Sequence, residues 1–545
     1  MNDPASSSIP SPAPTDFPLE WLEPRDATLT WEWDDMHMPM ALTPLAADYV
    51  GTIASGFSYG YERLGFPAEI KVRVLNGYAY FTLDTEVPEP EQAAMWERRT
   101  EAARAQILLT DAYWRRAVPQ LRDYYEWVAC AAVETMPFED LADRWDETWT
   151  RIGRCWSIHF YAIRGPYQVL EDLADLYESI VENASPGEAL GLIGGGVHEL
   201  HDVERELESL AALLAGTPAL AARIREPGAT VADLAGRPDA APFLTALDAF
   251  LARHGHLGQS FDDLALPSWG EDPGLLLAEL AKRVEHPPVV GADARREALT
   301  AHGEALAADV RARLADDAEK REQFDALLAA ARQIGHLTET HNYWIDRMAQ
   351  ASLRRFVMRV ARRLVDAGLI GDVTDILYLR RGEVPELLRA PDDRRGVVEG
   401  RRAEHATWSA TRPPKKVGAP STDDGESDRF DGKRFTSSEP DELRGTGASA
   451  GIVRGRARVT RTQADFAAVQ EGDIIVCSSS NPSWVPLFAI AGGLITDTGG
   501  VLSHAAVVAR EFALPAVVGT GDATSRIADG RLVELDGSNG IVRLL

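Results

Sequence analysis

The sequence has few cysteines, no long apolar run and no secretory signal. Its three cysteines among 545 residues, Cys130, Cys155 and Cys477, are widely spaced. This spacing argues against a disulfide framework and a cysteine-based zinc site, and it favours a reducing, cytoplasmic environment. No stretch of about 18 apolar residues is present, so we expect no membrane-spanning helix. Residues 1–16, rich in serine and proline, lack the apolar segment of a signal peptide.

Positive charge is also scarce. The chain has 56 lysines and arginines against 84 aspartates and glutamates, which gives a formal net charge of −28. Nearly all of this excess lies before residue 441. An acidic surface repels phosphate backbones and anionic lipid headgroups, so we expect neither nucleic acid nor membrane as a partner.

A phosphate loop for nucleotides is missing as well. The glycine run 194–196 is not followed by lysine and then serine or threonine, and it precedes a predicted helix. We therefore interpret it as a turn.

What the chain does contain divides it into parts. Its length allows about three or four domains, and a 45% apolar content allows large cores. Residues 1–20 are predicted to be a disordered leader, and residues 21–410 a tryptophan-rich, mostly helical body. Residues 411–440 combine paired prolines, lysines and aspartates with few large apolar side chains, which predicts a flexible linker. Residues 441–545 form the last domain.

Hydrophobic periodicity gives the coarse secondary structure of the body. Alternating apolar residues predict β structure over 70–83. Helical spacing predicts helices over 91–131, 171–183, 197–214, 295–334 and 343–367.

The most informative stretch is residues 498–511, where a histidine follows a glycine pair. Residues 493–496 predict a short buried strand, and the alanine-rich residues 505–512 predict a helix. Ser503 is a good N-cap, so His504 is expected in the first helical turn. Backbone N–H groups are unpaired there, and the helix dipole favours a bound phosphoryl group.

The chemistry expected of His504 follows from this position. A neutral imidazole is nucleophilic near pH 7, and its attack on a phosphate ester or anhydride gives a labile phosphohistidine. Thr498, Gly499, Gly500 and Ser503 would form the loop around the phosphate, because glycines allow the backbone to approach it closely. This position suits a histidine that carries a phosphoryl group, but position alone also fits a histidine that only caps the helix.

The C-terminal region resembles the phosphohistidine (swivelling) domain of the enzymes that use phosphoenolpyruvate. The resemblance is carried by the stretch around His504 and by residues 445–455, 472–476, 481–488, 514–519 and 529–540. It implies a β/β/α swivelling domain with His504 as the phosphoryl carrier. Ala450 stands where the family usually has proline.

Three segments of the body resemble the substrate-binding domain of rifampicin phosphotransferase and its relatives. They are residues 34–45, the pair of stretches 253–257 and 267–273, and residues 374–379 with Glu383. The fold class expected overall is therefore multidomain α+β, with a large, mostly helical substrate-binding body followed by the swivelling domain.

One departure from that family concerns charge. The family often has Arg-Glu-x-x-Lys at the start of its long helix, where this chain keeps Glu339 but has Thr338 and Asn342 in place of the two cations. His336, His341 and Arg347 are candidates to replace them. The loss of positive charge argues against rifampicin as the acceptor of the phosphoryl group.

The resemblance, together with what is missing, implies a split enzyme. We find no segment resembling an ATP-grasp domain, and no phosphoenolpyruvate-binding barrel follows residue 545. The chain is similar to the histidine-bearing subunit of a two-component dikinase of the phenylphosphate synthase type. A separate ATP-grasp subunit would bind ATP and Mg²⁺, and His504 would take the β-phosphoryl group and pass it to a phenol. The other products would be AMP and phosphate.

The acceptor step needs a base and a group that orients the hydroxyl. The candidates are His256, Glu339, His341 and Arg347. His198 and His201 lie three residues apart on a predicted helix without a third ligand, so we interpret them as surface residues and expect no metal site in this chain. Two alternatives stay open: an antibiotic-modifying subunit like rifampicin phosphotransferase, and a regulatory phosphocarrier without catalysis.

Overall fold

A computed structural model gives the fold of the chain. It describes residues 17–545, except residues 36, 67, 86, 183, 185, 227, 259–263, 286, 289, 412, 421–438, 461–464, 466, 467, 481–484, 489 and 502. Most of the predicted leader and linker, and half of the 481–488 stretch, therefore lie outside the described residues. The first described residue, Phe17, is buried against Tyr78 and Tyr80, so it belongs to the body and not to the leader.

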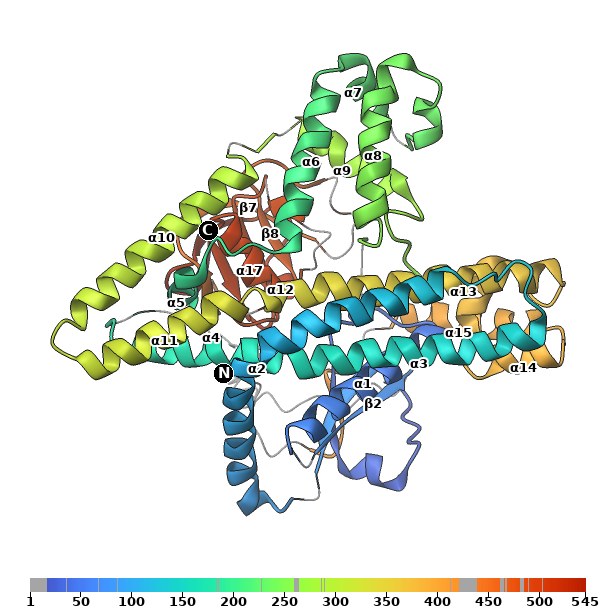
Figure 1. Cartoon of the computed structure of the whole chain (residues 1–545), viewed down its shortest axis with the longest axis horizontal. Coiled ribbons are helices and arrows are strands. Elements are labelled where there is room, and N and C mark those ends of the chain that lie inside the picture. The colour runs from blue at the N-terminus through green and yellow to red at the C-terminus, as the bar shows by residue number, and fades with distance from the viewer. Residues whose placement is uncertain are drawn as a thin grey trace, which may run out of the picture.

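Long helices form the centre of the body (Figure 1). They are α1 (Pro44–Arg63), α2 (Glu89–Ala129), α3 (Phe138–Ala162), α4 (Arg164–Glu178), α11 (Ala318–Ile334) and α13 (Met348–Asp366). Buried Trp145, Trp149, Ile152 and Trp156 recur on one face of α3 at the spacing of an amphipathic helix. A Cβ on Gly56 would lie 2.6 Å from that of Trp156, so only glycine lets α1 pack this closely on α3.

A separate helical lobe projects from this centre. It contains α6 (Glu199–Ala215), α7 (Pro218–Ile224), α8 (Ala241–His254) and α9 (Pro273–Glu285), which enclose a second core around Phe243 and Phe250. Within the described residues no single helix is long and apolar enough to cross a membrane, although the pair α6 and α7, bent by 114°, passes that test together.

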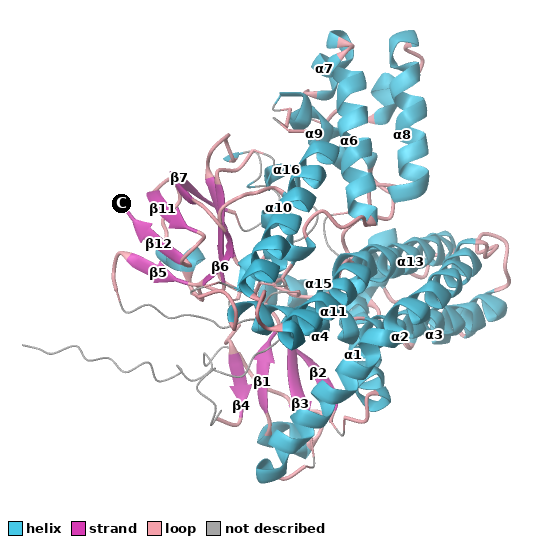
Figure 2. Ribbon diagram, turned by 60° about the vertical axis from the view of Figure 1, so that its left-hand side comes forward, coloured by secondary structure: helices cyan, strands magenta, loops and turns pink. Residues whose placement is uncertain are grey.

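A small antiparallel sheet packs below the helices (Figure 2). Its strand order is β2-β3-β1-β4, formed by Glu69–Leu75, Tyr78–Asp84, Thr30–Trp33 and Lys416–Gly418. The β2–β3 hairpin confirms the β structure predicted over 70–83. The last strand comes from the segment 411–440 that was predicted as a linker, so the beginning of that segment belongs to the body sheet.

The other elements connect these parts. The predicted helical stretch 295–334 forms two helices, α10 (Ala292–Arg313) and α11, and the glycine run 194–196 starts with the predicted turn. The remaining elements of the body are α5 (Pro186–Ala189), α12 (Leu337–His341), a π-helical turn (Asn342–Arg347), α14 (Glu383–Arg389), α15 (Arg395–Ser409) and short 3-10 turns at Pro24–Thr28, Leu190–Ile193, Val231–Leu234, Pro238–Ala240 and Val373–Tyr378.

The C-terminal domain is built on an eight-stranded sheet of order β5-β12-β11-β7-β8-β9-β10-β6. Strands β7 to β10 run parallel, and the others are antiparallel to their neighbours. The strands are Glu442–Arg444, Thr446–Ser449, Ile452–Val459, Ile474–Cys477, Gly493–Thr496, Ala516–Val518, Leu532–Asp536 and Ile541–Leu544 for β5 to β12; the helices are α16 (Val485–Phe488), α17 (His504–Glu511) and α18 (Ala523–Arg526). A mostly helical body followed by a β-sheet domain confirms the expected fold class.

Candidate active site between the two domains

His504 lies where the predicted strand and helix meet. The fully buried strand β9 ends at Thr496, and α17 begins at His504, as the sequence indicates. Gly499 has a φ of 97°, a left-handed conformation that favours glycine, and a Cβ there would lie 2.8 Å from Ser503 Oγ. The loop between them therefore depends on glycine for its turn.

Hydroxyl groups hold this loop by bonding to its backbone. Thr498 Oγ1 donates to the carbonyl of Ser478, and Ser503 Oγ donates to the carbonyl of Gly500. Ser503 is the N-cap residue, as predicted, but its side chain accepts no hydrogen bond from the helix. The N–H groups of the first turn of α17 are thus left without a side-chain cap, which suits an anionic ligand.

The two ring nitrogens of His504 have different environments. Nδ1 lies 3.3 Å from Oε2 of Glu339, which belongs to α12 of the body. Nε2 is buried and has no hydrogen-bond partner among the described residues. Because an ionised carboxylate only accepts hydrogen bonds, Glu339 places the ring proton on Nδ1 and leaves the lone pair on Nε2. The Nε2 atom is therefore the nucleophilic one.

Glu339 is ionised although it is buried. Burial alone would raise its pKa, but the hydrogen bond and charge of His504, together with His198 and His341, lower the pKa below its usual value. A buried carboxylate in contact with an imidazole is a strong orienting group.

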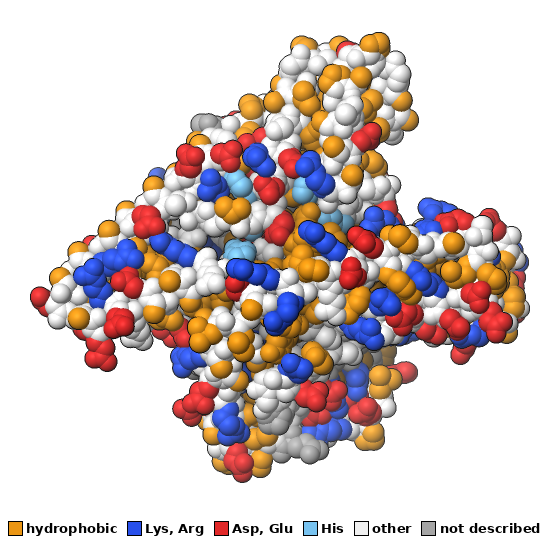
Figure 3. Space-filling view, viewed as in Figure 1, with side chains coloured by type: hydrophobic (Ala, Val, Ile, Leu, Met, Phe, Trp, Pro, Cys, Tyr) orange, Lys and Arg blue, Asp and Glu red, His pale blue; other side chains and the backbone are white. Residues whose placement is uncertain are grey.

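One face of α17 forms part of the contact between the domains, and β6 forms another part against α5. His504, Val508, Glu511 and Phe512 follow one another at helical spacing, and each of the last three lines a cavity against the body. Glu511 Oε1 lies 2.9 Å from Nε2 of His198 on the body. Histidine side chains lie among acidic and basic ones on this part of the surface (Figure 3).

His198 differs from its prediction as a surface residue. Its side chain is only 8% exposed, because it lies beneath α17. Burial alone would lower its pKa, but Glu511 and, farther away, Glu339 and Glu199 raise it to about 9. His201, by contrast, pairs within the body, with Asp293 at 3.1 Å.

Weakening of this interdomain ion pair at high pH is expected. Because contact with Glu511 raises the pKa of His198 to about 9, the contribution of this ion pair to docking is full below about pH 6.5. That contribution is lost as the pH rises through about 9. We expect His198→Gln to reduce docking at pH 7 by about 2- to 5-fold, since a partly exposed pair contributes modestly. Spin labels at exposed Leu108 and Ile452, with Cys130→Ser, would report the distance between the domains.

His405→Gln is the matched control, since this half-buried histidine bonds to the carbonyl of Ala41 within the body and does not line the interdomain cavity. If the His198→Gln chain and the unchanged chain gave equal distance distributions at pH 7, the ion pair between His198 and Glu511 would not stabilise docking.

A cavity adjoins this contact between α6, α10 and α17. Arg295 stacks over the ring of Phe512 at 4.7 Å, so cation and aromatic surface meet at its wall. The lining includes His198, Val203, Glu204, Leu257, Trp269, Arg295 and Arg347 from the body and Val508, Glu511 and Phe512 from α17.

The four predicted acceptor residues take different places. Glu339 contacts His504, and Arg347 lines the cavity. His256 packs edge-on against the ring of Tyr343, and burial, followed by nearby cations, lowers its pKa to about 3. His341 is buried, and its Nδ1 donates to the carbonyl of Leu337 at 2.6 Å.

Two residues near this site were not predicted. His159 of α3 and Asp346 of the π-helical turn lie beside His341. Nothing in the sequence links His159 to residues almost two hundred positions later. His341 and Asp346 are five residues apart, and only the π-helical turn places them on the same face.

The comparisons with known proteins agree with this division. Residues 469–540 match the mobile domain of PEP-utilising enzymes, and residues 171–339 match the fourth domain of rifampicin phosphotransferase. The contact between His504 and Glu339 therefore joins the two matched regions.

Similar curated proteins are longer than this chain. Chondramide synthase cmdD of Chondromyces crocatus is 31% identical over 98% of the chain, which corresponds to 14% of that protein. Rifampicin phosphotransferase of Streptomyces sviceus is 30% identical over 66% of the chain and 40% of its own length. The uncharacterized phosphotransferase YvkC of Bacillus subtilis is 30% identical over 56% of the chain and 36% of its own length. The chain thus spans less than half of each of these relatives. Its C-terminal part, which contains His504, is similar to the mobile domain of PEP-utilising enzymes, and its body contains a region similar to the fourth domain of rifampicin phosphotransferase.

Proposed function

We propose that Nε2 of His504 carries a phosphoryl group and delivers it to a hydroxyl of a small molecule bound in the body beside Glu339. The observation that carries this proposal is the asymmetry of the His504 ring: Nδ1 is held by Glu339, and Nε2 is buried without a partner among the described residues. A group on Nε2 would lie at the uncapped start of α17, where N–H groups and the helix dipole stabilise a phosphoryl anion.

The transfer step balances with the groups present. The acceptor oxygen bonds to phosphorus, the P–Nε2 bond breaks, and its electron pair returns to Nε2 of a neutral imidazole. The hydroxyl proton passes to the Glu339 carboxylate, which is ionised before the step. Arg347 and Arg295, on the cavity wall, supply positive charge for the transferring group.

We propose that the group comes from ATP and Mg²⁺ on a separate ATP-grasp subunit, with AMP and phosphate as the other products. The 545 residues contain no glycine-rich phosphate loop followed by lysine. The docked position of His504 on the body corresponds to delivery, so loading requires the domain to leave Glu339 and His198.

A phenol is the acceptor that we favour. Leu257, Trp269 and Phe512 give the cavity an apolar and aromatic wall, and Arg347 adds a cation. The name of the Streptomyces relative supports rifampicin as a second candidate. Against it, Thr338 and Asn342, which replace two cations of that family, bond only to the backbone carbonyls of Gly335 and Thr338 in the contacts described.

Phosphoramidate, a small phosphoryl donor for histidine, tests the proposal without the partner subunit. We expect the full chain to gain one phosphoryl group, mapped by mass spectrometry to His504. Addition of phenol should then remove it and form phenyl phosphate faster than water does. In a parallel incubation, faster loss of the phosphoryl group with rifampicin than with phenol would identify rifampicin as the acceptor. Labelling of a different residue, or a phosphohistidine that reaches no small molecule, would contradict transfer and favour a regulatory phosphocarrier.

A further inference from the structure

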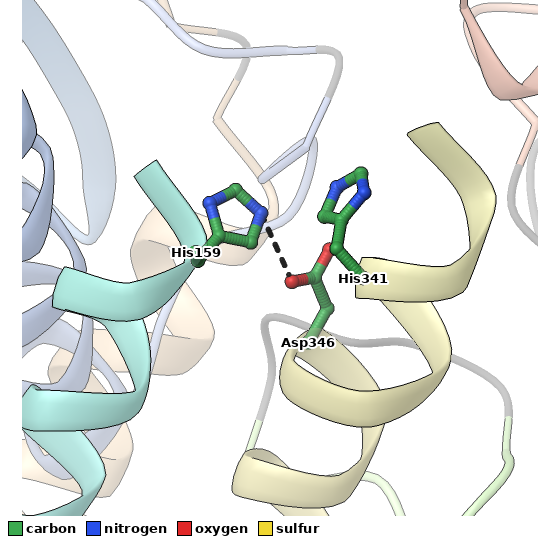
Figure 4. Close-up of side chains that lie close together, drawn as sticks. All are labelled: His159, His341 and Asp346. Carbon is green, nitrogen blue, oxygen red and sulfur yellow. Dashed lines mark ion pairs between the residues drawn. The ribbon is translucent and has the colours of Figure 1, made fainter. Parts of the chain in front are cut away.

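The buried cluster of His159, His341 and Asp346 is a second group of chemically active side chains (Figure 4). One ligand atom from each lies within 4.8 Å of the others, and all three residues are buried. The two histidine rings meet edge to face with centroids 4.6 Å apart. The cluster joins α3 to the segment that follows Glu339, so it lies next to the carboxylate that holds His504.

We propose that His159, His341 and Asp346 bind a divalent transition-metal ion of the zinc, cobalt or manganese type. Two imidazoles and one carboxylate are a common ligand set for such ions. Three protein ligands leave at least one coordination position open for water or another oxygen ligand. This proposal does not depend on the phosphoryl chemistry of His504, and it departs from the expectation that the chain has no metal site.

The hydrogen bond of His341 supports the proposal. Its Nδ1 donates to the carbonyl of Leu337, so the lone pair is on Nε2. A ligating histidine usually donates its other ring N–H to a carbonyl or carboxylate in this manner, which fixes its tautomer and orientation.

The other two side chains have unused polar atoms. Asp346 Oδ1 lies 3.1 Å from His159 Nε2, which makes an ion pair, and the buried Oδ1 atom has no other partner among the described residues. His159 Nδ1 is buried and unpartnered in the same way. A buried ring nitrogen without a partner is destabilising. A bound ion would satisfy the carboxylate and one ring nitrogen at once.

The backbone brings two of the ligands onto one face. His341 and Asp346 are five residues apart, and in an α-helix of about 3.6 residues per turn they would point in different directions. The turn Asn342–Arg347 is π-helical, with wider i to i+5 closure, so His341 and Asp346 face the same side. Such wide turns are rare and frequently mark functional sites.

Cobalt(II) binding to the full chain tests the proposal, because Co²⁺ in a site with nitrogen ligands absorbs visible light. We expect one Co²⁺ per chain, displaced by Zn²⁺, and a higher unfolding temperature with metal. His341→Ala and Asp346→Ala should each weaken Co²⁺ binding by at least about 100-fold, since loss of a mere supporting contact already costs 10- to 100-fold. His405→Gln is the matched control, because this half-buried histidine bonds to the carbonyl of Ala41 away from the cluster.

Circular dichroism of each variant would show whether it folds. If a variant does not fold, His159→Asn and the metal content of the unaltered chain by mass spectrometry decide the question. Absence of Co²⁺ and Zn²⁺ binding to the unaltered chain at micromolar concentrations would overturn the proposal. Equal Co²⁺ affinity in the folded cluster variants would overturn it as well.

Discussion

The His504→Ala chain is expected to lose phosphoryl transfer, with a rate at least about 10⁵-fold below that of the unaltered chain. The nucleophile of a covalent mechanism has no substitute once it is removed, and losses of this order are typical. Alanine is favourable in a helix and the imidazole lies at the first position of α17, so the fold should persist. Formation of phenyl phosphate from phosphoramidate-treated chain measures the effect.

A histidine outside the site gives the comparison for this variant. His405→Gln removes a half-buried imidazole from α15 that bonds to the carbonyl of Ala41, and this chain should transfer at the normal rate. If His504→Ala retained more than a small fraction of the rate, His504 would not be the carrier. Phosphoryl transfer through another side chain, such as His198, would then have to be considered.

The local part of this site could be predicted because its signals are local. The strand Gly493–Thr496, the turn at Gly499 and the helix that begins at His504 each depend on residues within a few positions of one another. The apolar run, the glycine and the N-cap residue specify those elements directly. Only the role of Ser503 differed, because its hydroxyl donates to Gly500 instead of capping the helix.

The contacts between distant segments could not be predicted in the same way. His198 follows the glycine turn and was interpreted as exposed, since a single sequence does not show that α17 covers it. Similarly, Lys416–Gly418 reads as part of a polar linker, but it forms a strand because β1 offers a free edge. These outcomes depend on tertiary packing, which overrides local composition.

The cluster of His159, His341 and Asp346 can be recognised only from the sequence and the tertiary structure together. The residue types are visible in the sequence, but α-helical periodicity separates His341 from Asp346, and only the π-helical turn brings them together. A periodicity analysis assumes one helical pitch, so it misses a site that is created by a change of pitch.

Replacement of Glu339 by glutamine is expected to slow phosphorylation of the docked His504 by phosphoramidate by about 10³- to 10⁴-fold while leaving the fold intact. Glutamine has nearly the same shape, but its amide can donate a hydrogen bond to Nδ1, which moves the ring proton to Nε2. The nucleophilic lone pair is then lost, and changes of this kind at other histidines held by a carboxylate have effects of about 10⁴-fold. The loss of the carboxylate also removes the proposed acceptor of the hydroxyl proton.

The rate of phosphoryl transfer from phosphoramidate to His504, and from His504 to phenol, measures both effects. ¹⁵N chemical shifts of the His504 ring distinguish the tautomers, and a merely structural role for Glu339 would not move them. Glu383→Gln is the matched control, because this carboxylate also accepts charged hydrogen bonds, from Arg401, but belongs to α14 at the far end of the body (Figure 1). If Glu339→Gln kept the normal rate with the proton still on Nδ1, the carboxylate would only help dock the domain, and the orientation of the imidazole would have to come from α17 itself.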